Sequence, residues 1–225
     1  MRHWKDGMHY IFQPYAWNLS DPESIPNLLL AHLALVGIVM LISLVISIPL
    51  GILVARYRRL YLPVISISGL LYTIPSLAAF ALLIPIFKLS PPNAIIPLVM
   101  YNLLVLVRNT AAGINAIDPL LLEVGRAMGM KPLQLLFRVT LPLALPVIVA
   151  GVRIATVTTI GIAALSYVAG QSTLGDLIFQ NLAVYDPDAI AAGAIMTAAL
   201  AIVADLLLLM LQAGLNRGRG AVSLA

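Results

Sequence analysis

Five long runs of apolar residues divide this chain. They cover residues 28–55, 62–87, 94–118, 141–168 and 188–212. A run of about 20 apolar residues is long enough to cross the hydrocarbon core of a membrane as a helix. Only 10% of the residues are charged, whereas a soluble domain carries about 25%. Lipid must therefore solvate much of this chain, which predicts an all-α, polytopic membrane protein with about five transmembrane helices.

The segments around these runs give the expected domain organisation. Residues 1–27 form an N-terminal segment, residues 28–213 a transmembrane domain, and residues 214–225 a tail. We expect no cleavable signal peptide, because residues 1–24 mix charged and aromatic side chains and lack a short apolar core.

The prolines of the second run and two segments between runs predict local structure. Pro63, Pro75 and Pro85 lie in the second run, which predicts a kinked helix packed among others. Residues 88–93 are expected to form a tight turn, and residues 170–185 a short interfacial helix.

The distribution of basic residues predicts the orientation. With the N-terminus outside, eight Lys and Arg residues fall on the cytoplasmic side and three on the outer side, which obeys the positive-inside bias. The eight are Arg56, Arg58, Arg59, Arg126, Lys131, Arg138, Arg217 and Arg219, and the three are Arg2, Lys5 and Lys88. We therefore expect the N-terminus outside and the C-terminus in the cytoplasm.

The sequence contains no motif for catalysis, nucleotide binding or metal binding. The chain has no Cys and no P-loop or His-Glu-x-x-His motif. Its three His residues are all N-terminal, and its Lys and Arg do not form one basic face. We expect no enzyme activity, no nucleic-acid partner, and neither a cofactor nor a metal bound by the chain itself.

The segment 119–140 is too charged to span a membrane, and its spacing predicts a helix–turn–helix elbow. A short helix from about Leu120 to Met128 can end at Gly129, because glycine accepts the left-handed conformation of a helix stop. Pro132 suits the first turn of a second helix. A merely amphipathic connection on the membrane surface is the alternative. The position of the segment on the predicted cytoplasmic side, directly before a span that begins Leu-Pro, favours the elbow.

This segment resembles the EAA loop of permease subunits of type I ABC importers. The loop has Glu-Ala-Ala, three residues, Gly, nine residues, Ile, one residue and Leu-Pro. Glu123, Gly129, Leu141 and Pro142 are in register, and Val139 replaces Ile. Val124 and Gly125 replace the two alanines, and Gly125 should weaken the first helix by up to about 1 kcal/mol. The resemblance implies ATPase-coupling roles for a set of loop residues: Glu123, Gly125, Ala127, Met128, Gly129, Leu141 and Pro142.

Further segments across residues 28–213 look like the branch that imports quaternary amines such as glycine betaine, choline and carnitine. These are residues 72–77, 107–110 with 118–119, 125–130 and 174–179. The methionine and phosphonate branches share the loop and stay open as alternatives.

The resemblance also implies a bacterial or archaeal cytoplasmic membrane and a set of partners. These are an ATPase dimer carrying ATP and Mg, a second permease subunit, a substrate-binding protein outside the membrane, and lipid. A self-sufficient secondary transporter is the main alternative from another class, and inverted repeats would favour it. No convincing internal repeat is visible.

Five residues are candidates for lining a pathway, because aromatic faces attract quaternary ammonium groups. Core packing or an aromatic belt at the membrane interface is the competing interpretation of each aromatic side chain. The candidates are Tyr72, Pro75, Phe80, Tyr101 and Tyr167.

Three charged residues lie well inside the apolar runs, away from their ends: Arg108, Arg153 and Asp205. Arg108 is expected to extend toward the cytoplasmic interface, and His32, near the start of the first run, to lie at the other interface. Arg153 and Asp205 fall roughly 16 and 10 Å from the cytoplasmic ends of their spans, at 1.5 Å per residue. An unpaired charge in hydrocarbon is costly, so we expect the two to form a pair. Separate contacts with a wetted pathway or a partner subunit are the alternative.

The orientation predicts which positions an impermeant thiol reagent can reach. A cysteine replacing Pro92 or Asp186 should be labelled from outside the cell, because both lie in predicted outer loops. A cysteine replacing Leu60 or Lys131 should react only after the membrane is permeabilised. Labelling at position 131 in intact cells would contradict the predicted orientation.

Overall fold

The computed structural model describes residues 10–220, with side chains described up to residue 214. This part contains helices and turns and no strand. Four helical segments are long and apolar enough to cross a membrane, and a bent helix pair makes a fifth. The four are α2 (Ile25–Arg56), α5 (Pro91–Asn115), the segment Pro132–Ala169 and α10 (Pro187–Gly220). The predicted all-α class with about five crossings is confirmed.

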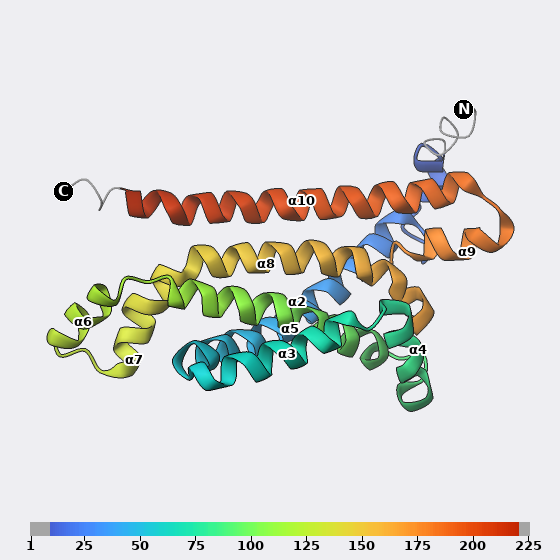
Figure 1. Ribbon diagram of the computed structural model, residues 1–225. Coiled ribbons are helices and arrows are strands. Elements are labelled where there is room, and N and C mark those ends of the chain that lie inside the picture. The colour runs from blue at the N-terminus through green and yellow to red at the C-terminus, as the bar shows by residue number, and fades with distance from the viewer. Residues whose placement is uncertain (1–9, 221–225) are drawn as a thin grey trace.

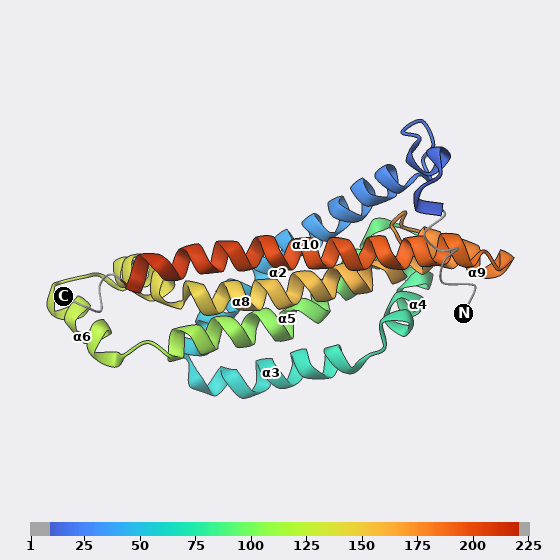
Figure 2. The same ribbon diagram turned by 90° about the horizontal axis from the view of Figure 1, so that it is seen from above.

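The long helices lie side by side around α5 and α8 (Leu141–Ala163), which contact each other and α2. α10 runs along α8, and α3 (Arg58–Thr73) runs along α5 (Figures 1 and 2). One end of the bundle carries the start of α2 together with α4 (Ser76–Phe87) and α9 (Asp176–Val184) (Figure 1). The other end carries the α2–α3 turn, the end of α10, and the short helices α6 (Pro119–Ala127) and α7 (Pro132–Leu135).

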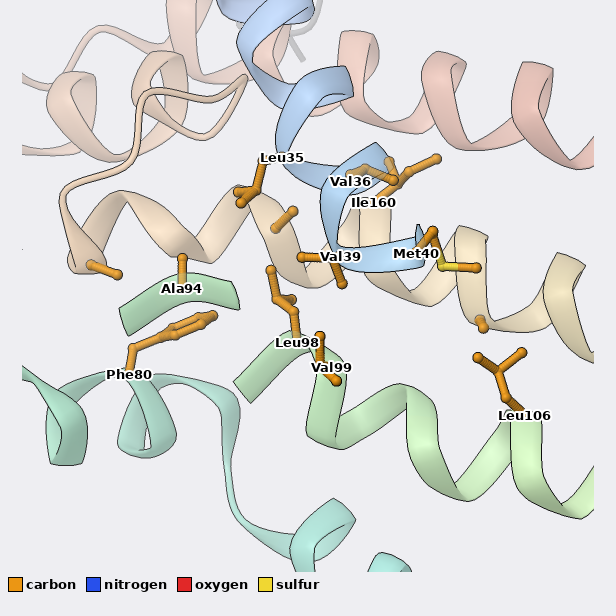
Figure 3. Packing of buried hydrophobic residues seen from close by; sticks show 13 residues of the cluster. Leu35, Val36, Val39, Met40, Phe80, Ala94, Leu98, Val99, Leu106 and Ile160 are labelled. Carbon is orange, nitrogen blue, oxygen red and sulfur yellow. The ribbon is translucent and has the colours of Figure 1, made fainter. Parts of the chain in front are cut away.

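Apolar side chains from α2, α4 (Ser76–Phe87), α5 and α8 fill the centre of the bundle. Val39, Phe80 and Leu98 are fully buried there, and Ile160 closes the cluster from α8 (Figure 3). Phe80 is therefore a core residue in this conformation, which was the competing interpretation of this pathway candidate.

A hydrogen-bonded cluster joins three of these helices, α2, α5 and α8. The Asn102 amide of α5 donates to Ser43 Oγ of α2 at 3.1 Å, and Thr159 Oγ1 of α8 donates to Asn102 Oδ1 at 3.0 Å. All three side chains are buried. A polar side chain in an apolar interior is stable only when its hydrogen bonds are made, so this cluster fixes the three helices to one another.

The second apolar run forms two helices rather than the single kinked helix that we expected. α3 ends at Thr73 and α4 begins at Ser76, and the two are bent by 91°. Pro75 explains the break, because a residue before proline is driven out of the helical region, and Ile74 is extended (φ −66°, ψ 124°). Pro63 and Pro85 lie inside helices without breaking them.

Other helix bounds differ from the apolar runs by a few residues. α2 begins at Ile25, with Pro26 in its first turn, and α5 begins at Pro91, inside the expected turn 88–93. Proline is suited to a first helical turn, where no amide donor is needed. α10 continues to Gly220, so helix extends into the expected tail 214–225. The N-terminal segment contains a 3-10 turn, Pro14–Trp17, and residues 1–9 lie outside the described part.

The expected interfacial helix is α9 (Asp176–Val184), which α10 and the 3-10 turn Ala164–Ala169 contact. Gly175 allows this contact, because a Cβ there would overlap the Ala164 carbonyl. The Thr173 amide donates to Asp176 Oδ1 at 3.0 Å, and burial raises the pKa of the Asp176 carboxyl.

Arg153 and Asp205 form the predicted pair. Arg153 Nε and Nη2 donate to Asp205 Oδ1 and Oδ2, each at 3.0 Å, which joins α8 to α10 by a two-pronged ion pair. Arg153 Nη1 donates to Gln212 Oε1 at 2.8 Å, and the Gln212 amide donates to the Pro146 carbonyl at 3.2 Å. All three guanidinium nitrogens therefore have acceptors. The pair borders an apolar groove of about 540 Å³ between the two helices.

The pair predicts a non-additive effect on stability. Asp205→Asn alone should lower the free energy of unfolding by about 2 to 3 kcal/mol, because it leaves the arginine charge unpaired in hydrocarbon. The double change Arg153→Gln with Asp205→Asn should cost less than Asp205→Asn alone. The free energy of unfolding of each variant is measured in the same bilayer mimetic. Gln212→Ala is the control, because it removes only a neutral partner of Arg153. A double variant that loses as much stability as Asp205→Asn, or more, would contradict a coupled pair.

Candidate functional site

The elbow consists of α6 (Pro119–Ala127), a turn, α7 (Pro132–Leu135) and the π-helical turn Leu136–Thr140. Asp118 caps α6, because its carboxylate accepts the Leu120 amide at 2.9 Å, and Pro119 occupies the first helical position. The Lys131 amide donates to Gln134 Oε1 at 2.9 Å at the start of α7. Both helix starts are therefore closed by local hydrogen bonds.

Gly129 ends α6 in the predicted way. Its φ is +78°, in the left-handed region. The Met130 amide donates to the Gly125 carbonyl at 3.2 Å, and the Gly129 amide donates to the Arg126 carbonyl at 2.9 Å. These two bonds are the pair that defines a Schellman motif, which satisfies the last carbonyls of the helix and turns the chain.

Gly125 has a role that our sequence interpretation missed. It is buried, and a Cβ there would lie 2.5 Å from Leu135 Cδ1, so the bare backbone lets the α7 side chain settle against α6. From the residues alone we expected this glycine to weaken the first helix, and the resemblance implied a coupling role. The structure shows that it also permits close packing between the two arms of the elbow. The Leu135 contact depends on tertiary structure and has no signal in the loop spacing.

The second arm of the elbow continues directly into a spanning helix. α7, the π-helical turn, α8 and the 3-10 turn form one helical segment from Pro132 to Ala169. Leu141 and Pro142 lie where the π register changes to α. Because proline has no amide hydrogen, Pro142 cannot continue the donor ladder at this point. Thr140 Oγ1 donates to the Leu135 carbonyl at 3.3 Å.

The elbow carries many exposed apolar side chains. Its exposed large apolar side chains are Leu120, Leu121, Val124, Met128, Leu133 and Phe137, and basic side chains are exposed on it as well. Ala127 is exposed with them, and Glu123 lies on the same short helix with no hydrogen-bond or ion-pair partner within the described chain. Figures 1 and 2 both show α6 projecting beyond the spanning helices. A projecting apolar patch of this kind is typical of a surface that binds another protein.

The structure brings three of the five pathway candidates together at the α3–α4 break. The Tyr72 and Tyr101 rings pack edge to face with centroids 5.9 Å apart, and Tyr101 Oη donates to the Ile74 carbonyl at 2.8 Å, next to Pro75. Tyr72 is exposed and Tyr101 is buried. Tyr167 lies elsewhere, on the 3-10 turn, where it stacks on Phe179.

The two remaining ionisable candidates lie apart from the elbow. Arg108 is exposed on α5 and has no ion-pair partner within residues 10–214. His32 is fully buried between helices, which its position near the start of the first apolar run did not predict. Its Nε2 donates to the Ile160 carbonyl at 3.1 Å, because α2 packs against α8 at this level.

Known proteins resemble this chain over most of its length. It is 44% identical over 177 residues to the "Glycine betaine/carnitine/choline transport system permease protein OpuCD" of Bacillus subtilis, a match that covers 78% of this chain and 77% of the relative. It is 38% identical over 212 residues to the "Osmoprotectant import permease protein OsmW" of Salmonella typhimurium, covering 92% and 95%.

The fold also matches solved structures and a family model. An inward-facing structure of the MetNI methionine ABC transporter has a TM-score of 0.77 at 23% identity, covering 90% of this chain and 98% of that one. The model of the binding-protein-dependent transport system inner membrane component matches residues 47–218, which include the whole elbow. This chain therefore belongs to the family of binding-protein-dependent transport system inner membrane components.

Proposed function

We propose that this chain is the permease subunit of an ABC importer for a quaternary amine osmoprotectant. The observation that carries the proposal is the elbow, whose apolar outer arm projects from the bundle and whose inner arm is continuous with a spanning helix. The chain contributes the pathway, and a separate ATPase dimer holds ATP and Mg. No P-loop is present in the sequence.

The substrate class rests on the relatives. Their names include glycine betaine, carnitine and choline, which all carry a quaternary ammonium group. Such a cation is attracted to aromatic faces. The exposed Tyr72 ring beside Tyr101 is our candidate contact on the pathway. The methionine transporter shares the fold at 23% identity, which is too distant to argue for its substrate.

The elbow would work as a mechanical link. The Schellman motif at Gly129 and the Gly125–Leu135 contact hold its two arms at one angle. A displacement of α6 by the ATPase would therefore move α7 with it. Because α7 is continuous with α8, the displacement would reach Arg153, and through Asp205 the last spanning helix, α10.

The proposed assembly contains two permease subunits, two ATPase subunits and a binding protein that delivers the solute. We place the elbow in the cytoplasm of a bacterium or archaeon and the N-terminus outside. Support comes from the basic residues. The α2–α3 turn lies at the same end of the bundle as the elbow (Figure 1), and Arg56 ends α2 while Arg58 and Arg59 begin α3.

Two substitutions at Gly129 test the link. Gly129→Val should reduce ATP-dependent uptake by about tenfold, because a β-branched residue pays roughly 1 to 2 kcal/mol in the left-handed region. Gly129→Asn should retain most uptake, since asparagine tolerates this conformation. A Cβ at this position meets no atom within 4 Å, so the two variants differ in backbone strain and not in steric overlap. Uptake by proteoliposomes and co-purification with the ATPase measure the effect.

Glu123→Gln completes the test, because Glu123 is exposed and has no partner within the described chain. It should leave the thermal stability of the subunit unchanged and weaken its association with the ATPase. Wild-type uptake by the Gly129→Val protein would contradict the coupling role of the elbow.

A further inference from the structure

The turn between α2 and α3 gathers three arginines, none of which has an acidic partner among the described residues. Tyr57 is the only residue between the two helices, so Arg56, Arg58 and Arg59 follow one another closely, and all three are exposed. The only ion pair within residues 10–214 is Arg153–Asp205. The Arg56 guanidinium lies 5.8 Å from the centre of the Tyr57 ring. We call residues 56–60 the arginine hairpin.

The start of α3 makes this charge cluster unusual. The first turn of a helix carries free amide groups and a partial positive charge, which favour acidic side chains. α3 has no acidic residue in its first turn, no side-chain cap, and instead Arg58 and Arg59. The Leu60 amide donates to the Tyr57 carbonyl at 2.8 Å. The guanidinium groups of Arg58 and Arg59 and the positive N-terminal end of α3 therefore repel one another. An anion bound between them would remove this repulsion.

The arginine hairpin also contains a groove. Its five residues line an open groove of about 600 Å³. Tyr57 and Leu60 contribute apolar surface to it, and Leu53 is exposed one turn earlier on α2. Guanidinium groups beside an apolar surface, at the end of two membrane helices, match the chemistry of a phospholipid at the bilayer interface.

We propose that the arginine hairpin binds the phosphate group of an anionic phospholipid. Arginine forms paired hydrogen bonds to phosphate oxygens, and a helix N-terminus adds backbone donors of the same sign. The lipid's glycerol and first chain carbons would lie along Tyr57 and Leu60. The bound phosphate would offset the repulsion at the start of α3 and hold the α2–α3 turn at the membrane surface. This inference rests on membrane insertion and is independent of the transported solute.

The test compares lipid binding by two charge-matched variants of the full chain. One carries Arg56→Gln, Arg58→Gln and Arg59→Gln. The other removes three positive charges from the elbow at the same end of the bundle, by Arg126→Gln, Lys131→Gln and Arg138→Gln. Each protein is placed in phosphatidylcholine nanodiscs with and without phosphatidylglycerol, and native mass spectrometry gives the apparent affinity for phosphatidylglycerol.

The hairpin variant should lose at least about tenfold in this affinity, since each arginine near an anionic surface contributes about fivefold. The elbow variant should lose much less. Equal losses in both would show attraction by net charge alone and overturn the site, as would full affinity in the hairpin variant.

Two further measurements keep the result unambiguous. Arg58→Glu places an acidic residue in the first turn of α3, so it should preserve or raise thermal stability while abolishing selective binding. Loss of binding with intact stability therefore supports the site, and retained binding overturns it. Inorganic phosphate at matched ionic strength should not displace phosphatidylglycerol. Displacement by phosphate would identify a soluble anion as the ligand and contradict the lipid proposal.

Discussion

Hydrocarbon offers no hydrogen bonds, so a polar side chain inside the bundle is stabilised when it bonds to a group on a neighbouring helix. This constraint explains which helices are joined. Asn102 connects α2, α5 and α8 through Ser43 and Thr159. Arg153 connects α8 to α10 through Asp205. The carbonyl of Ile74, freed where α3 breaks, accepts a hydrogen bond from Tyr101 of α5. These contacts all lie between helices. They therefore define which helices are neighbours more sharply than apolar packing alone would.

The same constraint shapes the route from the elbow to the bundle. A proline at the start of α8 removes a donor, and the chain responds with a π-helical turn and not with a break. Helix thus continues from Pro132 to Ala169. The outer arm, α6, is fixed to this helix by a left-handed glycine and by a second glycine that lets Leu135 approach. Stiffness in the elbow and continuity through the membrane together suit the transmission of movement.

Much of the fold and of the elbow could be predicted from local properties of the sequence. Apolar run lengths predicted the crossings, and Gly129 and Pro132 predicted the elbow, because both depend on backbone properties of single residues. Depth along two helices also predicted the Arg153–Asp205 pair. The 91° break at Pro75 was missed, since Pro63 and Pro85 have the same local chemistry and do not break their helices. The burial of His32 and the role of Gly125 were also missed, because both depend on which helix lies opposite.

The central claim is that this chain moves its solute only when an ATPase drives the elbow. Uptake of labelled glycine betaine into proteoliposomes tests it most directly, with the chain reconstituted alone or with its ATPase and binding protein. The account predicts uptake only in the complete system, in the presence of hydrolysable ATP. Saturable uptake by the chain alone, driven by a solute or ion gradient, would contradict the account and indicate a self-sufficient transporter.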